Sequence, residues 1–247
     1  MSVSGIQNTY ANLSSGYKIN SAADNASGLA ISEKITAKSM GYEVGSANAK
    51  DGIGLLNVTE GALSGIHDSL QRIRELGVKA MNGLYSDSDR RAIQSEIDGI
   101  MQSIQSTAKG TTFNTMKPLD GSMADMKLAT NPEGGGLKIK LANSTLESLG
   151  IAGFNVMGEF DLDAIDKVIE KVSKARSKYG AQTNALEHTI RNNDYSNYNL
   201  TSANSKLKDT DYGEEMMKKN REEVLEQYRI FGIKSKTEAD AGVLKLL

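Results

Sequence analysis

Cysteine and tryptophan are absent from the 247-residue sequence, and only two prolines are present, Pro118 and Pro132. The lack of cysteine excludes disulfide bonds and thiolate metal sites, and it fits either an intracellular or an exported protein. Because proline is the strongest helix breaker, the stretches before and after these two residues are free to form long helices. Aromatic residues make up only 5% of the chain. The core must therefore be aliphatic, which suits helices packed along their sides.

Charge and apolar patterning exclude several classes of function. The net charge is -2 and the sequence pI is about 5.8, without the basic stripe that is typical of nucleic-acid binding. No apolar run approaches the roughly 18 residues that indicate membrane insertion, and the first ten residues lack the pattern of a cleaved signal peptide. His67 and His188 are the only histidines and form no HExxH motif. We therefore expect no enzyme activity, metal site or cofactor.

Apolar residues in the first third of the chain recur at alternating steps of three and four, which places them on one face of a helix. This pattern predicts a helix over about residues 30–84. Ser86 and Asp89 then form a pair like a capping box, with Asp in place of the usual Glu or Gln. A second helix is expected over about residues 87–109. The residues of the first repeat are Leu56, Leu63, Ile66, Leu70, Ile73, Gly77, Ala80 and Leu84.

The central segment, residues 111–159, has a different pattern. It contains both prolines and a run of three glycines at 134–136. Apolar residues alternate with polar or small ones on either side of a turn-rich loop, at Met126 and Leu128 and again at Leu137, Ile139 and Leu141. Two short strands joined as a β-hairpin are the natural interpretation.

A third helix is predicted over about residues 161–209, where a residue recurs at every seventh position. Only Asn193 interrupts the apolar series, and a polar residue in such a repeat can fix the register of helix packing. An unbroken helix here would be roughly 70 Å long at its rise of 1.5 Å per residue. It needs a partner helix of similar length, and residues 30–84 supply one. The repeat consists of Ile165, Val172, Tyr179, Leu186, Asn193, Leu200 and Leu207.

These elements predict a mainly α fold: an elongated antiparallel helical bundle, or coiled-coil rod, that pairs the N- and C-terminal segments and carries a small β-hairpin region. Residues 29–212 would form the rod, and residues 1–28 with 213–247 would form a terminal domain of paired chain ends, partly disordered in the monomer. Ten residues, called the seam residues below, are expected to carry helix packing and assembly: Leu56, Leu63, Ile66, Leu70, Ile73, Ile165, Val172, Leu186, Leu200 and Leu207.

Several segments resemble bacterial flagellin, and they occur in the order found in that family. Asn25 and Ser27 are mild departures within the second of them. The similar segments are 13–20 (LSSGYKIN), 24–31 (DNASGLAI), 51–54 (DGIG), 59–63 (TEGAL), 70–76 (LQRIREL), 112–114 (TFN), 119–121 (LDG), 200–203 (LTSA) and 209–212 (DTDY).

The resemblance implies that the two chain ends pair as a coiled coil in the inner tube of a filament, with a helical rod and β-hairpin outside it. Further outer domains are expected to be absent, because only residues 111–159 separate the rod helices. Two departures stand out. The chain begins later than flagellins usually do before the LSSG segment, and residues 222–233 are more charged than the usual tail. The final residues 243–247 (VLKLL) keep the family ending.

The resemblance further implies a secreted structural subunit that polymerises with itself into the flagellar filament for motility. It would leave the cell by type III export and meet an export chaperone and hook-associated or cap proteins. Two alternatives stay open, the first because of the altered ends and the second because the superfamily includes such proteins. The chain could be a flagellin-like paralogue that does not polymerise, or a hook–filament junction protein, acting in interaction or adhesion.

One surface resembles the part of flagellins that the vertebrate innate immune receptor contacts. Arg72 and Leu76 are one helical turn apart and share a face. The plainer alternative is a charged helix surface that packs between subunits of the filament. The residues that the resemblance assigns to receptor contact are Gln71, Arg72, Glu75, Leu76 and Glu96.

Overall fold

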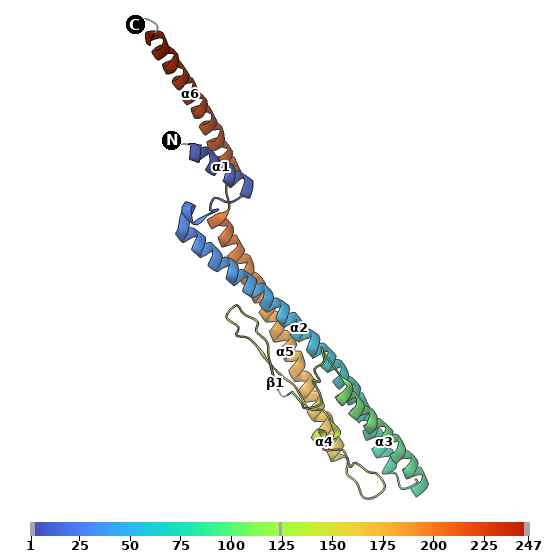
Figure 1. Cartoon of the computed structure of the whole chain (residues 1–247). Coiled ribbons are helices and arrows are strands. Elements are labelled where there is room, and N and C mark those ends of the chain that lie inside the picture. The colour runs from blue at the N-terminus through green and yellow to red at the C-terminus, as the bar shows by residue number, and fades with distance from the viewer. Residues whose placement is uncertain (1–2, 124, 245–247) are drawn as a thin grey trace. The chain divides into compact units, whose positions relative to one another are not determined.

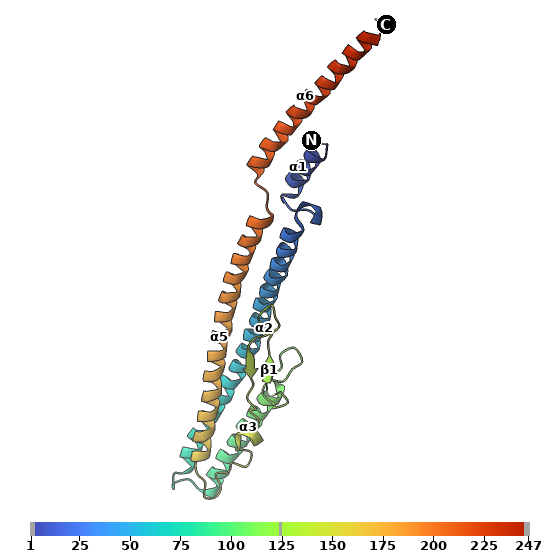
Figure 2. The same ribbon diagram turned by 90° about the vertical axis from the view of Figure 1, so that its left-hand side faces the viewer.

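The computed structural model describes residues 3–123 and 125–244, with side chains from 5 to 123 and from 125 to 238. It contains long helices and a small two-stranded sheet (Figures 1 and 2). The chain divides into two compact units. Unit 1 comprises the described residues up to Ser39 and those from Asn197 onward, and unit 2 is Met40–Ser196.

Unit 2 is built on two antiparallel helices, α2 (Ala22–Ala80) and α5 (Asp163–Lys208), which also extend into unit 1. Their direction follows from the cross-links. Ser46, in the first half of α2, donates a hydrogen bond to Asp194, in the second half of α5. Glu60, farther along α2, pairs with Arg176, which lies in the first half of α5. The third helix, α3 (Asp87–Gly110), adds a row of apolar side chains to the same core. The mainly α, antiparallel fold expected from the sequence is confirmed.

The turn between α2 and α3 differs from the sequence prediction at one end. α2 ends at Ala80, four residues before the predicted end, and Leu84 is 90% exposed instead of lying in the repeat. The side-chain oxygen of Asn82 accepts the Leu84 N–H at 3.0 Å, so a local turn replaces the last helical turn. α3 begins as predicted, because Ser86 and Asp89 form a capping box.

The predicted hairpin is present in the central segment. Strands β1 (Asp125–Lys127) and β2 (Lys138–Lys140) are antiparallel, and Met126 faces Ile139 in the register. Beyond the strands the two arms stay paired up to a tight turn, at which Gly134 has φ +77°. A short helix, α4 (Leu146–Leu149), follows and ends at Gly150, with φ +82°. A single helical turn has no periodicity, so the sequence pattern could not predict it.

Unit 1 holds both ends of the chain. α1 (Val3–Ser15) lies beside the first half of α6 (Tyr212–Leu244). The linkers after α1 and before α6 also pair, through an isolated bridge between Tyr17 and Asp209. α2 is interrupted at Asn25, which has φ −164°, and the Asn25 side chain accepts the Gly28 N–H at 2.8 Å. Asn25 therefore caps the continuous part of the helix, so this departure from the flagellin motif keeps a capping residue.

Candidate assembly surfaces

The ten seam residues fall into two groups. Eight are at most 2% exposed inside unit 2, and they pack against one another within the single chain. Leu200 and Leu207 are half-buried in unit 1. Fully burying one aliphatic side chain stabilises a fold by about 1.5–3 kcal/mol. The eight buried residues therefore stabilise the fold of the single chain and are not exposed for contact with another copy.

Asn193, the polar residue in the α5 repeat, anchors the hairpin. It is 4% exposed, and its Nδ2 donates to the backbone oxygen of Thr130 at 2.8 Å. The residues of α2 that lie against this part of the hairpin are glycines. A Cβ at Gly45 would lie 2.5 Å from the same Thr130 oxygen, and one at Gly41 would lie 2.7 Å from Pro132 Cβ. The hairpin arm therefore lies directly against the α2 backbone. The signal that could have predicted this contact is glycine at spacings of four and seven, at positions 41, 45 and 52.

Tyr179 fixes the base of the hairpin to α5. Its side chain is 1% exposed, and its hydroxyl oxygen accepts the Ala142 N–H at 2.8 Å. Burial raises the pKa of the Tyr179 phenol above its ordinary value of 10.0, while the Ala142 N–H acts in the opposite direction. The hydroxyl therefore stays protonated and keeps its own hydrogen for donation.

The two terminal helices are joined by polar contacts. Tyr10 donates to Glu223 at 2.8 Å, and the Asn12 amide donates to Glu215 at 3.0 Å. The Tyr10 hydroxyl is the largest cause of a lowered pKa at Glu223. All of these α6 partners precede residue 224. The terminal pairing expected from the sequence is thus present over the first half of α6.

The second half of α6 carries large apolar side chains that are exposed. Phe231 and Tyr228 are each 72% exposed. These side chains, together called the α6 face below, are distributed around the helix rather than along one side of it, and each is about half exposed or more. The sequence prediction did not single it out, because its charged residues mask the apolar ones. The α6 face consists of Val224, Leu225, Tyr228, Ile230, Phe231 and Ile233.

The predicted receptor-contact residues are close together, with one exception. Arg72 donates to Glu96 at 2.8 Å and to Glu75 at 3.1 Å, and these hydrogen bonds raise the pKa of the guanidinium. Gln71 is exposed beside them. Leu76 is a correction: it is 2% exposed and lies in the core, because α2 turns this position toward α3 and α5. A buried side chain cannot contribute to a surface contact.

Two further observations concern the described residues alone. They contain no group of three or more His, Cys, Asp or Glu side chains arranged to hold a metal ion. Among them, no helix has an 18-residue stretch apolar enough to cross a membrane.

Known proteins match this chain along most of its length. Residues 2–124 match the bacterial flagellin N-terminal helical region, and residues 162–245 match the bacterial flagellin C-terminal helical region. A flagellin of Halalkalibacterium halodurans is 36% identical over 95% of this chain and 89% of its own length. A Bacillus subtilis flagellin is 34% identical over 99% of this chain and 93% of its own length.

Solved structures agree with these relatives. The crystal structure of Bacillus cereus flagellin superposes with a TM-score of 0.54 at 25% identity, covering 60% of this chain and 88% of that one. A putative flagellar hook-associated protein from Vibrio parahaemolyticus has a TM-score of 0.58 over 75% of this chain and all of that one, but at 17% identity the likeness concerns the fold alone. On the strength of the two aligned flagellins, the chain belongs to the bacterial flagellin family.

Proposed function

We propose that this chain is a structural subunit that polymerises with copies of itself into a flagellar filament, outside the cell. One observation carries the proposal: relatives named flagellin align with nearly the whole chain, including both terminal helical regions. A non-polymerising paralogue or a hook–filament junction protein is less well supported. The hook-associated likeness is a likeness of fold, whereas the two flagellin relatives are 36% and 34% identical to the chain over nearly its whole length.

The α6 face is the contact that we assign to polymerisation. Large apolar side chains that are exposed in such number on one helix are typical of a segment that binds another protein. Burying a side chain of the size of Ile230 or Phe231 contributes up to about 1.5–3 kcal/mol. Burial of six such residues can therefore exceed the conformational entropy cost of ordering the end of the helix. A surface that binds a different surface of the next copy forms an open helical polymer when the rotation does not close.

Residues 1–28 and 213–247 would form the inner layer of this filament, and residues 29–212 the rod outside it. The support is that the hydrogen bonds between described side chains of α1 and α6 reach Glu215, Glu222 and Glu223, all before residue 224. The uncovered part is then available to neighbouring subunits. Residues 245–247, which resemble the family ending, lie outside the described residues.

Electron microscopy of the concentrated protein, with and without filament seeds, tests the proposal. The variant Phe231→Ser should fail to form filaments, or should raise the concentration needed for assembly. Leu84→Ser is the matched control, because it removes an exposed aliphatic side chain from the turn between α2 and α3. We expect filaments from this control. Absence of filaments from the unmodified chain on every seed would contradict polymerisation.

Before assembly, the exposed apolar side chains of the α6 face would promote premature self-association unless another protein covers them or the concentration of the chain is low. We therefore infer that an export chaperone binds the C-terminal helix before secretion by the flagellar type III route, and that hook-associated or cap proteins contact the same helix at the ends of the filament. Pull-down with an isolated flagellar chaperone should succeed for the unmodified chain and weaken for Phe231→Ser. Equal capture of both proteins would contradict this assignment.

The Arg72 cluster is the surface that we assign to the vertebrate innate immune receptor, with Gln71, Glu75 and Glu96 as its neighbours. Its support is the exposed, mutually paired arrangement on α2 and α3. Arg72→Ala should reduce receptor activation in a reporter cell assay, whereas Arg176→Ala, on another part of unit 2, should not. Equal signalling by Arg72→Ala and the unmodified chain would leave this surface as a subunit contact or a solvated helix face.

A further inference from the structure

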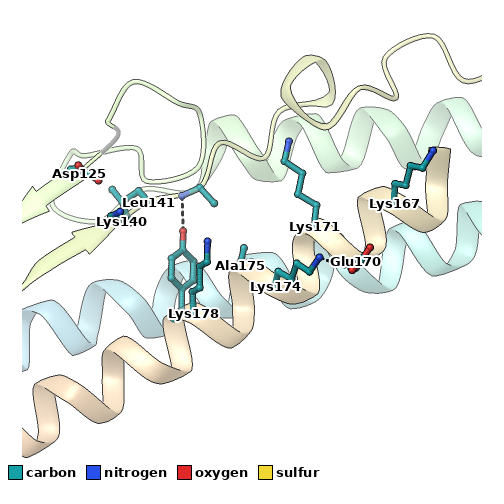
Figure 3. A pocket seen from close by; sticks show the side chains of 11 residues that line it. Asp125, Lys140, Leu141, Lys167, Glu170, Lys171, Lys174, Ala175 and Lys178 are labelled. Atoms are coloured by element: carbon teal, nitrogen blue, oxygen red, sulfur yellow. Dashed lines mark hydrogen bonds and ion pairs between the residues drawn. The ribbon is translucent and has the colours of Figure 1, made fainter. Parts of the chain in front are cut away.

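A groove rich in lysine runs along α5 and the end of β2 in unit 2 (Figure 3). It encloses about 490 Å³, and five of its eleven lining residues are lysines. The half-buried Leu141, Ala142 and Ala175 and the buried Tyr179 line it between the charged side chains. The lysines are Lys140, Lys167, Lys171, Lys174 and Lys178.

The positive charge of this groove exceeds its internal compensation. Its two carboxylates are already engaged: Glu170 with Lys174 at 2.6 Å, and Asp125 with Lys138 outside the groove at 2.5 Å. The neighbouring lysines lower the pKa of both carboxyl groups, so the carboxyls stay ionised near neutral pH. The Lys171 ammonium donates to the backbone oxygen of Ser148 at 2.6 Å.

The remaining three lysines, Lys140, Lys167 and Lys178, form no ion pair with the residues that the structure describes. Their ammonium groups are therefore available to a ligand. The Arg72 cluster differs, because its single guanidinium has two carboxylate partners.

The α5 lysines are spaced for a linear ligand. They occupy positions 167, 171, 174 and 178, so steps of four, three and four place them on one helix face. Their Cα atoms span roughly 17 Å at a rise of 1.5 Å per residue. Like charges one helical turn apart destabilise a helix slightly. A ligand with several negative charges along its length would remove this repulsion.

We propose that this groove binds an anionic polysaccharide. Lysine offers point charges that suit separated sulfate or carboxylate groups, and the apolar strip suits the C–H faces of sugar rings. The Tyr179 hydroxyl retains one hydrogen to donate. Single-stranded nucleic acids bind through exposed aromatic side chains on which bases stack, and the only aromatic residue of this groove is the buried Tyr179. The bases of a nucleic acid would therefore have no exposed aromatic ring in this groove on which to stack.

The test measures binding of a fluorescent heparin hexasaccharide to the unassembled full chain by fluorescence polarisation, at several salt concentrations. The unmodified chain should bind more weakly as salt rises. Binding releases counterions from the polyanion, and this release is less favourable when the salt concentration in solution is high. The triple variant Lys140→Gln, Lys167→Gln, Lys178→Gln should bind about tenfold more weakly or worse, with a shallower salt dependence. A neutral dextran oligosaccharide of equal length should not bind.

The matched control is Lys34→Gln, Lys50→Gln, Lys117→Gln, which removes three exposed lysines outside the groove. It changes the net charge equally and should keep its affinity. Equal loss in both triple variants would show attraction by overall charge and overturn the proposal, as would no binding by the unmodified chain. Binding of single-stranded DNA as tight as that of the hexasaccharide would overturn the choice of polysaccharide. Circular dichroism verifies that each variant is folded.

Discussion

Asn193→Ala is the substitution that most sharply tests how the hairpin is held in unit 2. The change deletes the amide that donates to the Thr130 backbone oxygen at 2.8 Å. Both residues are buried, at 4% and 3% exposure, so water cannot easily replace the lost donor. The variant therefore leaves a buried carbonyl without this partner and a small void beside it.

The expected cost follows from these two changes. Leaving a buried acceptor unsatisfied costs about 1–3 kcal/mol, and incomplete collapse of the void adds to it. We therefore expect a loss of about 2 kcal/mol in the free energy of unfolding. In a unit of this size that corresponds to a lower melting temperature by about 4–8 °C.

The assay is thermal unfolding followed by far-ultraviolet circular dichroism, combined with amide hydrogen exchange of residues 128–137. The control is Asn192→Ala, which removes the same side chain from the adjacent exposed position. We expect the control to melt within about 0.5 kcal/mol of the unmodified chain. Faster exchange should appear in the hairpin arm of Asn193→Ala only. If the two variants melt together and exchange alike, Asn193 does not anchor the hairpin.

Further predictions concern the same unit. Gly45→Ala should destabilise the chain by about 1–3 kcal/mol, because the new Cβ would lie 2.5 Å from the Thr130 oxygen. Gly61→Ala, in open space on the same helix, should stabilise it by up to about 1 kcal/mol; thermal melting separates the two outcomes, and equal shifts would contradict the glycine contact. Ser86→Ala should raise the pKa of Asp89 toward its ordinary value of 3.8, because the Ser86 hydroxyl and N–H hold that pKa down. A lowered carboxyl pKa stabilises the folded state above the unfolded-state pKa, and this stabilisation is lost as the pH falls through the folded-state value. Titration of Asp89 by nuclear magnetic resonance verifies this, and an unchanged pKa in Ser86→Ala would contradict it.

Helix periodicity predicted most of the architecture because each long helix repeats one local rule many times. Ile165 and Val172 could be assigned to a buried face from spacing alone, and the Ser86–Asp89 cap could be read from two residues. Helix periodicity gives a wrong prediction where a single side-chain contact ends the helix. Leu84 continues the repeat, but the Asn82 side chain ends the helix before it.

Tertiary contacts account for what the sequence left unpredicted. Leu76 has the same helical spacing from Arg72 as an exposed neighbour would have, and only the packing of α2 against α3 and α5 buries it. The glycines that receive the hairpin could not be paired with Thr130 and Pro132 without coordinates. The sequence analysis did not single out the α5 lysines, and the groove that they line exists only because β2 and the residues after it lie beside them.

The central claim is that the uncovered half of α6 becomes buried between subunits when the chain polymerises. Amide hydrogen exchange of residues 224–238, compared between the monomer and seeded filaments, tests it most directly. We predict rapid exchange in the monomer and strong protection in the filament, with Arg72 and its neighbours on α2 protected in both. Equal exchange of residues 224–238 in monomer and filament would contradict the claim.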